Sequence, residues 1–329
     1  MTELAPSFVG HDLAMREVQD AFASGRMPHA WLIAGIEGIG KATLAKHIAQ
    51  FVLANGQGEL GKIDPQHRVA KLVDAETHPD LLIIRRPVDE KTGELRNLIP
   101  VDEALKVGVF LHKTATHGGW RVVVLDEAHT LNRNGQNAIL KIVEEPPPRA
   151  LILITVTTPG VLLPTIRSRA RVLQMAPLGG DDMRRILRHT APQASPEDIA
   201  AVIDLSGGSV GFALKILRAE ALPLYREMLG ILDAMPHMDI ARVHKLADQV
   251  ARKADAESFE VLSALLIERL RKAAHEEAHR SPDGESVNRV NLAVHLWDKT
   301  RATFEAAATA NLDRKLAFIN AISEIRAAL

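Results

Sequence analysis

Residues 35–43 read Gly35-Ile-Glu-Gly-Ile-Gly-Lys-Ala-Thr43 and decide the fold of this chain. An apolar run typical of a short strand (residues 31–34) precedes them, and a helical pattern (residues 44–54) follows them. Glycines at this point let backbone N–H groups curl around phosphate oxygens, and the following helix adds its positive end. The loop thus predicts a phosphate-binding turn in which Gly35, Gly38, Gly40 and Lys41 hold a nucleotide such as ATP or ADP.

One position of this loop departs from the pattern. The residue after the lysine is Ala42, where a hydroxyl normally ligates the Mg²⁺ ion that bridges the phosphates. Thr43 lies one helical position further, turned by about 100°, and is a poor substitute. We therefore expect Mg²⁺ to bind weakly or not at all, and Thr43 to contribute at most to the nucleotide.

A second apolar run, Val122-Val-Val-Leu125, ends in Asp126 and Glu127. Carboxylates at the end of a central strand can hold Mg²⁺ through water and polarise an attacking water molecule. Because the run lies at a suitable distance after the phosphate loop, Asp126 and Glu127 are candidate catalytic residues.

The pattern along the chain predicts an α/β fold followed by helices. Apolar strands at 31–34, 81–84, 121–125 and 151–156 alternate with helical segments, which favours a doubly wound parallel sheet covered on both faces. Residues 55–79 are polar and contain glycine, and we expect an insertion or a loop with a short helix there. After Pro177 the pattern is helical throughout.

Composition narrows the class of protein. The 329 residues are 47% hydrophobic with a formal charge of −1, so the chain is not basic overall and any nucleic-acid contact must be local or shared. It contains no cysteine, which excludes disulfides and thiolate metal sites. Residues 1–6 lack an export signal, and no apolar run approaches the roughly 20 residues that span a bilayer. We expect a cytoplasmic protein without membrane contact.

Further motifs in fixed order complete a recognisable succession. They are Phe8-Val-Gly-His11, Gly25-Arg-Met-Pro-His-Ala-Trp31, Asn137-Ala-Ile-Leu-Lys-Ile-Val-Glu-Glu-Pro-Pro147 and Thr157-Thr-Pro-Gly-Val-Leu-Leu-Pro-Thr-Ile-Arg-Ser-Arg169. Over residues 8–178 this succession resembles the AAA+ clamp-loader subunits of bacterial DNA polymerase III, most closely their delta-prime branch. The resemblance implies an AAA+ nucleotide-binding domain over 1–177, a small helical lid over 178–221 and an all-α collar domain for oligomerisation over 222–329.

The resemblance also implies roles for single residues. Ser168-Arg169 matches the family's Ser-Arg-Cys motif with Ala170 in place of the cysteine, so Arg169 would be an arginine finger that acts in trans on a neighbouring subunit's nucleotide. Thr157 matches the polar sensor residue after the fourth strand. Gly211 stands where active members carry a second, phosphate-sensing arginine.

Family members usually carry a four-cysteine zinc module after the first helix, where this chain has residues 55–79. Without cysteine we expect no zinc and no other metal site, and we expect His67 and His78 to be solvent-exposed.

The resemblance implies a pentameric hetero-oligomer of clamp-loader subunits that places the sliding clamp on primed DNA, which this chain would contact indirectly. Within it the chain would be a weak or inactive ATPase that donates Arg169. Two alternatives stay open. The first is an active AAA+ ATPase, either the loader's motor subunit or another remodeller; the second is an assembly scaffold that binds no nucleotide.

Overall fold

The computed structural model describes residues 8–89, 93, 95–116, 118–252, 256–279, 284–309 and 313–328. Residues 1–6, in which the sequence shows no export signal, lie outside the described part. The chain divides into two compact units, one formed by 1–192 with 206–211 and the other by 193–205 with 212–329. The division into three domains at 177 and 221 stays a prediction.

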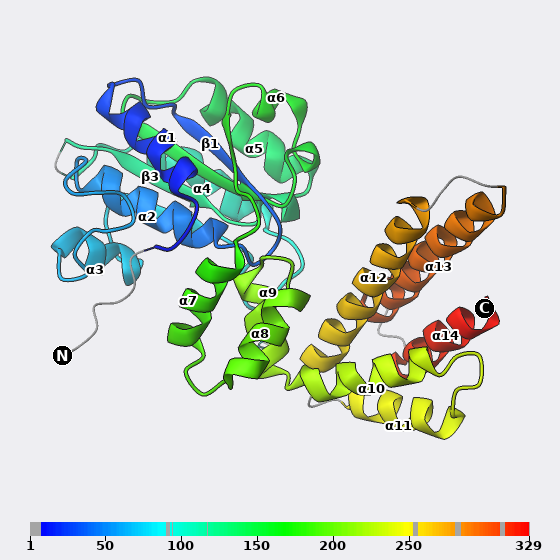
Figure 1. Cartoon of the computed structure of the whole chain (residues 1–329). Helices are drawn as coiled ribbons and strands as arrows, with labels where there is room; N and C mark the ends of the chain where they lie inside the picture. The colour runs from blue at the N-terminus through cyan, green and yellow to red at the C-terminus, as the bar shows by residue number, and fades with distance from the viewer. Residues whose placement is uncertain are drawn as a thin grey trace. The chain divides into compact units, whose positions relative to one another are not determined.

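The first unit is built on a five-stranded, all-parallel sheet with the order β2-β3-β4-β1-β5 (Figure 1). Its strands are β1 Ala30–Ala34, β2 Leu81–Ile84, β3 Arg121–Leu125, β4 Ala150–Val156 and β5 Arg171–Gln174. Four of them match the predicted strands. Strand β5 was not predicted, because an edge strand with three exposed side chains out of four carries no apolar run.

Helices connect these strands. They are α1 Asp12–Ala23, α2 Lys41–Leu53, α3 Arg68–Asp74, α4 Val101–Leu111, α5 Arg133–Glu144, α6 Pro164–Arg167 and α7 Gly180–Thr190, with short 3₁₀ turns at Ala128–Thr130 and Pro159–Val161. Helix α3 confirms the short helix expected within residues 55–79. The alternation of strands and helices confirms the doubly wound α/β fold.

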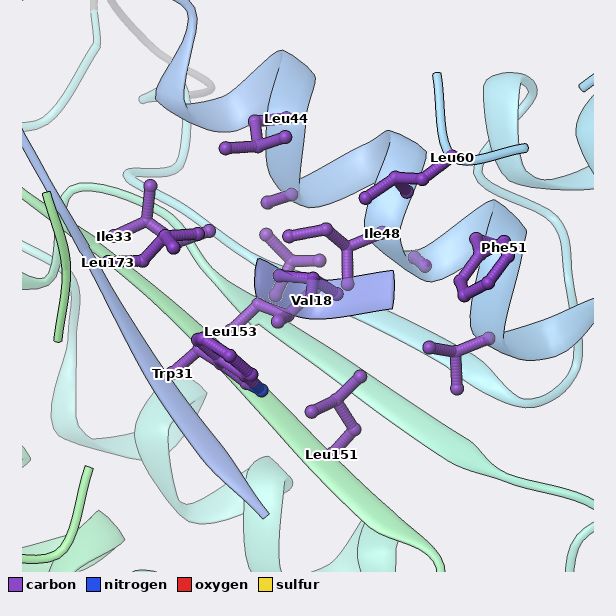
Figure 2. Close-up of a cluster of buried hydrophobic side chains, with 14 of the residues drawn as sticks. Val18, Trp31, Ile33, Leu44, Ile48, Phe51, Leu60, Leu151, Leu153 and Leu173 are labelled. Atoms are coloured by element: carbon purple, nitrogen blue, oxygen red, sulfur yellow. The ribbon is translucent and has the colours of Figure 1, made fainter. Parts of the chain in front are cut away.

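Successive residues of the strands enter two different cores because side chains alternate across a sheet. Trp31 and Ile33 of β1 lie in one core with Leu151 and Leu153 of β4, whereas Leu32 lies in the other. Helices α1 and α2 cover the first core, and α4 and α5 cover the second. Figure 2 shows the first core, where Val18 of α1 and Ile48 and Phe51 of α2 face the sheet.

The described residues of the second unit form helices joined by short turns, with no strand among them. Its helices are α8 Pro196–Leu205, α10 Ala221–Asp233, α11 Ile240–Val250, α12 Ala256–His279, α13 Gly284–Thr309 and α14 Arg314–Ala327. Helix α9 Val210–Arg218 begins with two residues of the first unit and continues in the second from Phe212. The long helices α12 and α13 lie side by side (Figure 1). Phe304 packs against Phe259 and Phe318, with ring centroids 5.6 Å and 6.1 Å apart. These aromatic contacts give the unit a core of its own.

No helix in the described ranges is long and apolar enough to span a membrane.

The packing of β4 gives a first testable prediction. Leu153 of this central strand is 0% exposed, whereas Leu13 on the outer side of α1 is 79% exposed. Leu153→Ala should lower the free energy of unfolding of the first unit by about 2–5 kcal/mol, because it removes buried methyl groups and leaves a cavity. Leu13→Ala should change it by less than about 0.5 kcal/mol. Urea unfolding followed by circular dichroism compares the two, and equal losses would contradict the burial described here.

Candidate functional site

The phosphate-loop sequence forms the turn between β1 and α2. The loop leaves the buried strand β1 at Gly35, and α2 begins at Lys41. Gly38 and Gly40 have φ angles of 74° and 101°, a left-handed backbone conformation that glycine adopts without steric cost. The two glycines therefore shape a turn that leads into the positively polarised N-terminus of α2.

Lys41 is engaged within this loop. Its side chain is largely buried, and Nζ donates to the backbone oxygens of Gly35 and Ile36, each at 2.8 Å. Burial lowers the pKa of Lys41 because it disfavours the charged ammonium, while the carboxylates of Glu37, Asp126 and Glu127 act in the opposite direction. The negative charges of both candidate catalytic residues thus reach the lysine of the loop.

The two residues after the lysine differ in exposure. Ala42 is half-buried and Thr43 is exposed on α2. The hydroxyl in the first turn of α2 thus belongs to an exposed side chain, Thr43.

Asp126 follows β3 at the same edge of the sheet. Strands β3 and β1 both pair with β4 in parallel, with Leu125 opposite Ile154 and Ala34 opposite Val156. Because the carboxyl ends of parallel strands share an edge, Asp126 lies on the side of the sheet where the loop begins. Its Oδ1 accepts a hydrogen bond of 2.6 Å from Thr155 Oγ1 and one of 3.1 Å from the backbone N–H of Glu127.

Glu127 is bound by a residue that the sequence analysis did not single out. Arg86, two residues after the end of β2, donates from Nε to Glu127 Oε2 at 2.6 Å. Glu127 has a left-handed φ of 52°, and its N–H also donates to Thr155 Oγ1 at 2.8 Å. The carboxylate that would polarise a water molecule is therefore neutralised by a guanidinium.

Thr155, two residues before the predicted sensor Thr157, forms hydrogen bonds with Asp126 and with the backbone of Glu127. Thr155 is fully buried within β4, and Thr157 follows directly after this strand with a half-buried side chain. A polar residue within the otherwise apolar run 150–156 was the signal in the sequence that could have identified Thr155.

Arg169 lies near the amino ends of the strands, whereas the loop lies at their carboxyl ends. It precedes β5 by two residues, and Arg171 at the start of β5 pairs with Trp31 near the amino end of β1. The loop leaves the carboxyl end of β1, about 13 Å further along the strand direction at 3.3 Å per residue. Arg169 is 40% exposed and contacts Glu144 Oε1 at 3.1 Å and the oxygen of Thr165 at 3.0 Å. It therefore lies at the other end of the strands from its own phosphate loop.

Gly211 is in direct contact with the loop. Its N–H donates to the oxygen of Gly38 at 2.8 Å, and Ser209 Oγ donates to the oxygen of Glu37, also at 2.8 Å. His11 adds a third contact, from Nε2 to the oxygen of Ile39 at 3.2 Å. From the sequence, Gly211 was notable only because it replaces an arginine, and Ser209 had no predicted role.

The histidines of residues 55–79 bind backbone groups. His67 accepts the N–H of Val69 at 3.3 Å and begins α3, and His78 accepts the N–H of Asp80 at 3.1 Å. Both side chains are half-buried, so the expectation that they are solvent-exposed was wrong, because each forms a local cap of the backbone. Within the described residues no three His, Asp or Glu side chains are grouped so as to hold a metal ion.

The surroundings of the loop predict a dependence of stability on pH. Burial is the main cause that lowers the pKa of both His11 and His47; opposing it are the Ile39 oxygen, Asp182 and Asp12 at the first, and Gln50 and Asp74 at the second. The folded-state pKa of each histidine lies below the unfolded value of about 6.5. The stability that the two neutral, buried imidazoles contribute is therefore complete above pH 6.5. It is lost as the pH falls through 6.5 towards the folded-state pKa, since the unfolded chain then binds more protons.

Urea unfolding at pH 7.5 and 5.5 tests this expectation. His47→Gln should reduce the loss of stability between the two pH values relative to the wild type. The same substitution at the exposed His189 should leave the loss unchanged. An unaltered loss in His47→Gln would contradict the argument from burial.

Comparison with known proteins identifies the family of this chain. The model of a family described as "DNA polymerase III, delta subunit" matches residues 10–179, just over half of the chain. DNA polymerase III subunit delta' of Pseudomonas aeruginosa is 36% identical over 182 residues, 55% of this chain and 53% of that protein. The delta' subunit of Escherichia coli is 30% identical over 200 residues, 61% of this chain and 58% of that protein.

Other subunits are also similar. The gamma/tau subunit of Mycobacterium tuberculosis is 29% identical over 280 residues, 78% of this chain and 44% of that protein. The matches therefore cover about half the length of these curated relatives. A solved structure of a gamma-subunit-related protein of DNA polymerase III from Thermotoga maritima covers 95% of this chain and is itself covered to 99%, with 17% identity and a TM-score of 0.47.

The part of the chain that the family model matches contains the glycine loop, the paired carboxylates and the parallel sheet. This protein belongs to the DNA polymerase III delta-subunit family of AAA+ clamp-loader proteins.

Proposed function

We propose that this chain is the delta-prime subunit of a DNA polymerase III clamp loader and that it donates Arg169 to a nucleotide held by an adjacent subunit. In this role it helps place the sliding clamp on primed DNA within a pentameric hetero-oligomer, and it contacts DNA indirectly. The match to delta' proteins supports the choice of subunit. Its chemistry would be a guanidinium that stabilises charge on a γ-phosphate in trans.

The position of Arg169 is the observation that carries this proposal. Its exposed side chain lies near the amino ends of the strands, and its own loop lies at their carboxyl ends. Arg169 is therefore available to another molecule and not to its own phosphate site. Glu144 and the oxygen of Thr165 hold the guanidinium at the surface. A fork with a fixed direction loses less entropy when it binds a phosphate than a free side chain would.

The geometry of the chain's own site supports weak or no hydrolysis. Thr43 is exposed, Ala42 has no oxygen, and Glu127 is paired with Arg86. The loop and Lys41 fit the phosphates of ATP or ADP, because two left-handed glycines shape the turn and the ammonium lies beside it. A nucleotide held there would supply negative charge for Lys41, while Mg²⁺ would have few ligands from this chain.

A reconstituted clamp loader tests the role of Arg169. Arg169→Ala should assemble normally and lower the ATP turnover of the complete loader by about 10³-fold or more if the guanidinium acts on the transition state. Arg184→Ala is a matched control, because Arg184 pairs with Asp181 on the surface of α7. Normal turnover of an assembled loader that contains Arg169→Ala would contradict the proposal.

An active ATPase is the second candidate, and the similarity to gamma/tau subunits together with the retained Lys41 favours it. We expect the isolated chain with Mg²⁺ to show no ATP hydrolysis above background. Hydrolysis that is lost in Lys41→Ala would instead identify a motor subunit.

Equilibrium binding of a fluorescent ATP analogue addresses the third reading, a scaffold without nucleotide. We expect measurable binding that Lys41→Ala weakens, because the lysine would lie beside the phosphates. Equal signals from the two chains would favour the scaffold.

A further inference from the structure

The phosphate loop is bonded to its own chain at each of its carbonyl groups. Lys41 Nζ binds the oxygens of Gly35 and Ile36. The remaining pairs of donor and accepting oxygen are Ser209 Oγ with Glu37, the Gly211 N–H with Gly38, His11 Nε2 with Ile39 and the Leu44 N–H with Gly40. Three of these six bonds come from α2, which the loop precedes. The segment 206–211 and His11 supply the donors for the other three, along residues 37–39.

The segment 206–211, which we call the latch, is itself fixed to the first unit. The N–H of Leu178 donates to the oxygen of Gly208 at 3.1 Å, and the N–H of Ser209 donates to the oxygen of Ser206, also at 3.1 Å. Both serines are buried. The latch is thus held on one side by residues after β5 and on the other by the loop.

Gly211 makes this close approach sterically possible. A Cβ atom at this position would lie 2.7 Å from Gly38 Cα and 3.2 Å from Gly38 O. These are backbone atoms of the loop, which cannot move aside as a flexible side chain could. Any side chain at 211 must therefore displace the latch or deform the loop.

We infer that Gly211 and Ser209 are positioning residues that hold the phosphate loop in one conformation without a bound nucleotide. A glycine in place of the arginine at 211 removes a phosphate contact, and it also allows the latch to contact the loop closely. The inference deepens the proposed function by naming how its weak nucleotide site is regulated. Gly211→Arg would displace the latch and would not by itself create an ATPase.

Hydrogen–deuterium exchange of the full chain tests the latch. Gly211→Ala should speed amide exchange in peptides covering residues 35–44 and 204–214 by about tenfold or more, because the latch opens. Alanine has a higher helix propensity than glycine, so without a clash the substitution would slow exchange or leave it unchanged. Faster exchange would therefore indicate the clash with Gly38. Gly108→Ala in α4 is the control, because its Cβ would meet no atom within 4 Å; it should leave exchange of the loop unchanged.

Ser209→Ala provides a second, milder variant if Gly211→Ala does not fold. It removes one hydrogen bond to the loop and should speed exchange of the loop by about fivefold. Unchanged exchange of residues 35–44 in Ser209→Ala, or an equal effect of Gly108→Ala, would overturn the inference. Because the measurement uses the isolated chain, its failure is distinct from a failure of the Arg169 experiment.

Discussion

Strand β1 is paired on both sides, to β4 and β5, and covered on both faces, and this double constraint positions the functional residues of the first unit. A strand so enclosed cannot shift register without moving Trp31 and Leu32 into the wrong cores. Its carboxyl end therefore presents Gly35 at a fixed point beside the residues that follow β3 and β4. The same pairing fixes the opposite edge, where Arg169 enters β5.

As a result, different functional groups lie at the carboxyl ends and at the amino ends of the strands. At the carboxyl edge Lys41 is surrounded by loop carbonyls and by the charge of two carboxylates, one of them paired with Arg86. At the amino edge a guanidinium is exposed and held by surface contacts. Because a stiff, packed sheet separates the two, a role of Arg169 in its own phosphate site has no support in the geometry. This separation is the geometric basis of the proposal that Arg169 acts on a neighbouring subunit.

The tightness of the loop has a direct physical origin. Backbone carbonyls turned away from water need donors, and here the chain supplies one for every carbonyl from Gly35 to Gly40. A loop with its own hydrogen bonds does not depend on a ligand to become ordered. The resemblance to clamp-loader subunits drew attention to the arginine missing at 211, whereas the structure shows why a glycine suits that position.

The sequence by itself determined the phosphate loop, four of the five strands, the carboxylates after β3 and the family, because apolar periodicity and glycine spacing are local properties of the chain. It missed β5, whose exposed edge leaves no apolar run. It also could not identify the partners of the site, namely Arg86 on Glu127, Thr155 on Asp126 and the latch on the loop. Those pairs join residues between 29 and 173 positions apart, and only the packing of the parallel sheet and its flanking segments brings them within hydrogen-bonding distance.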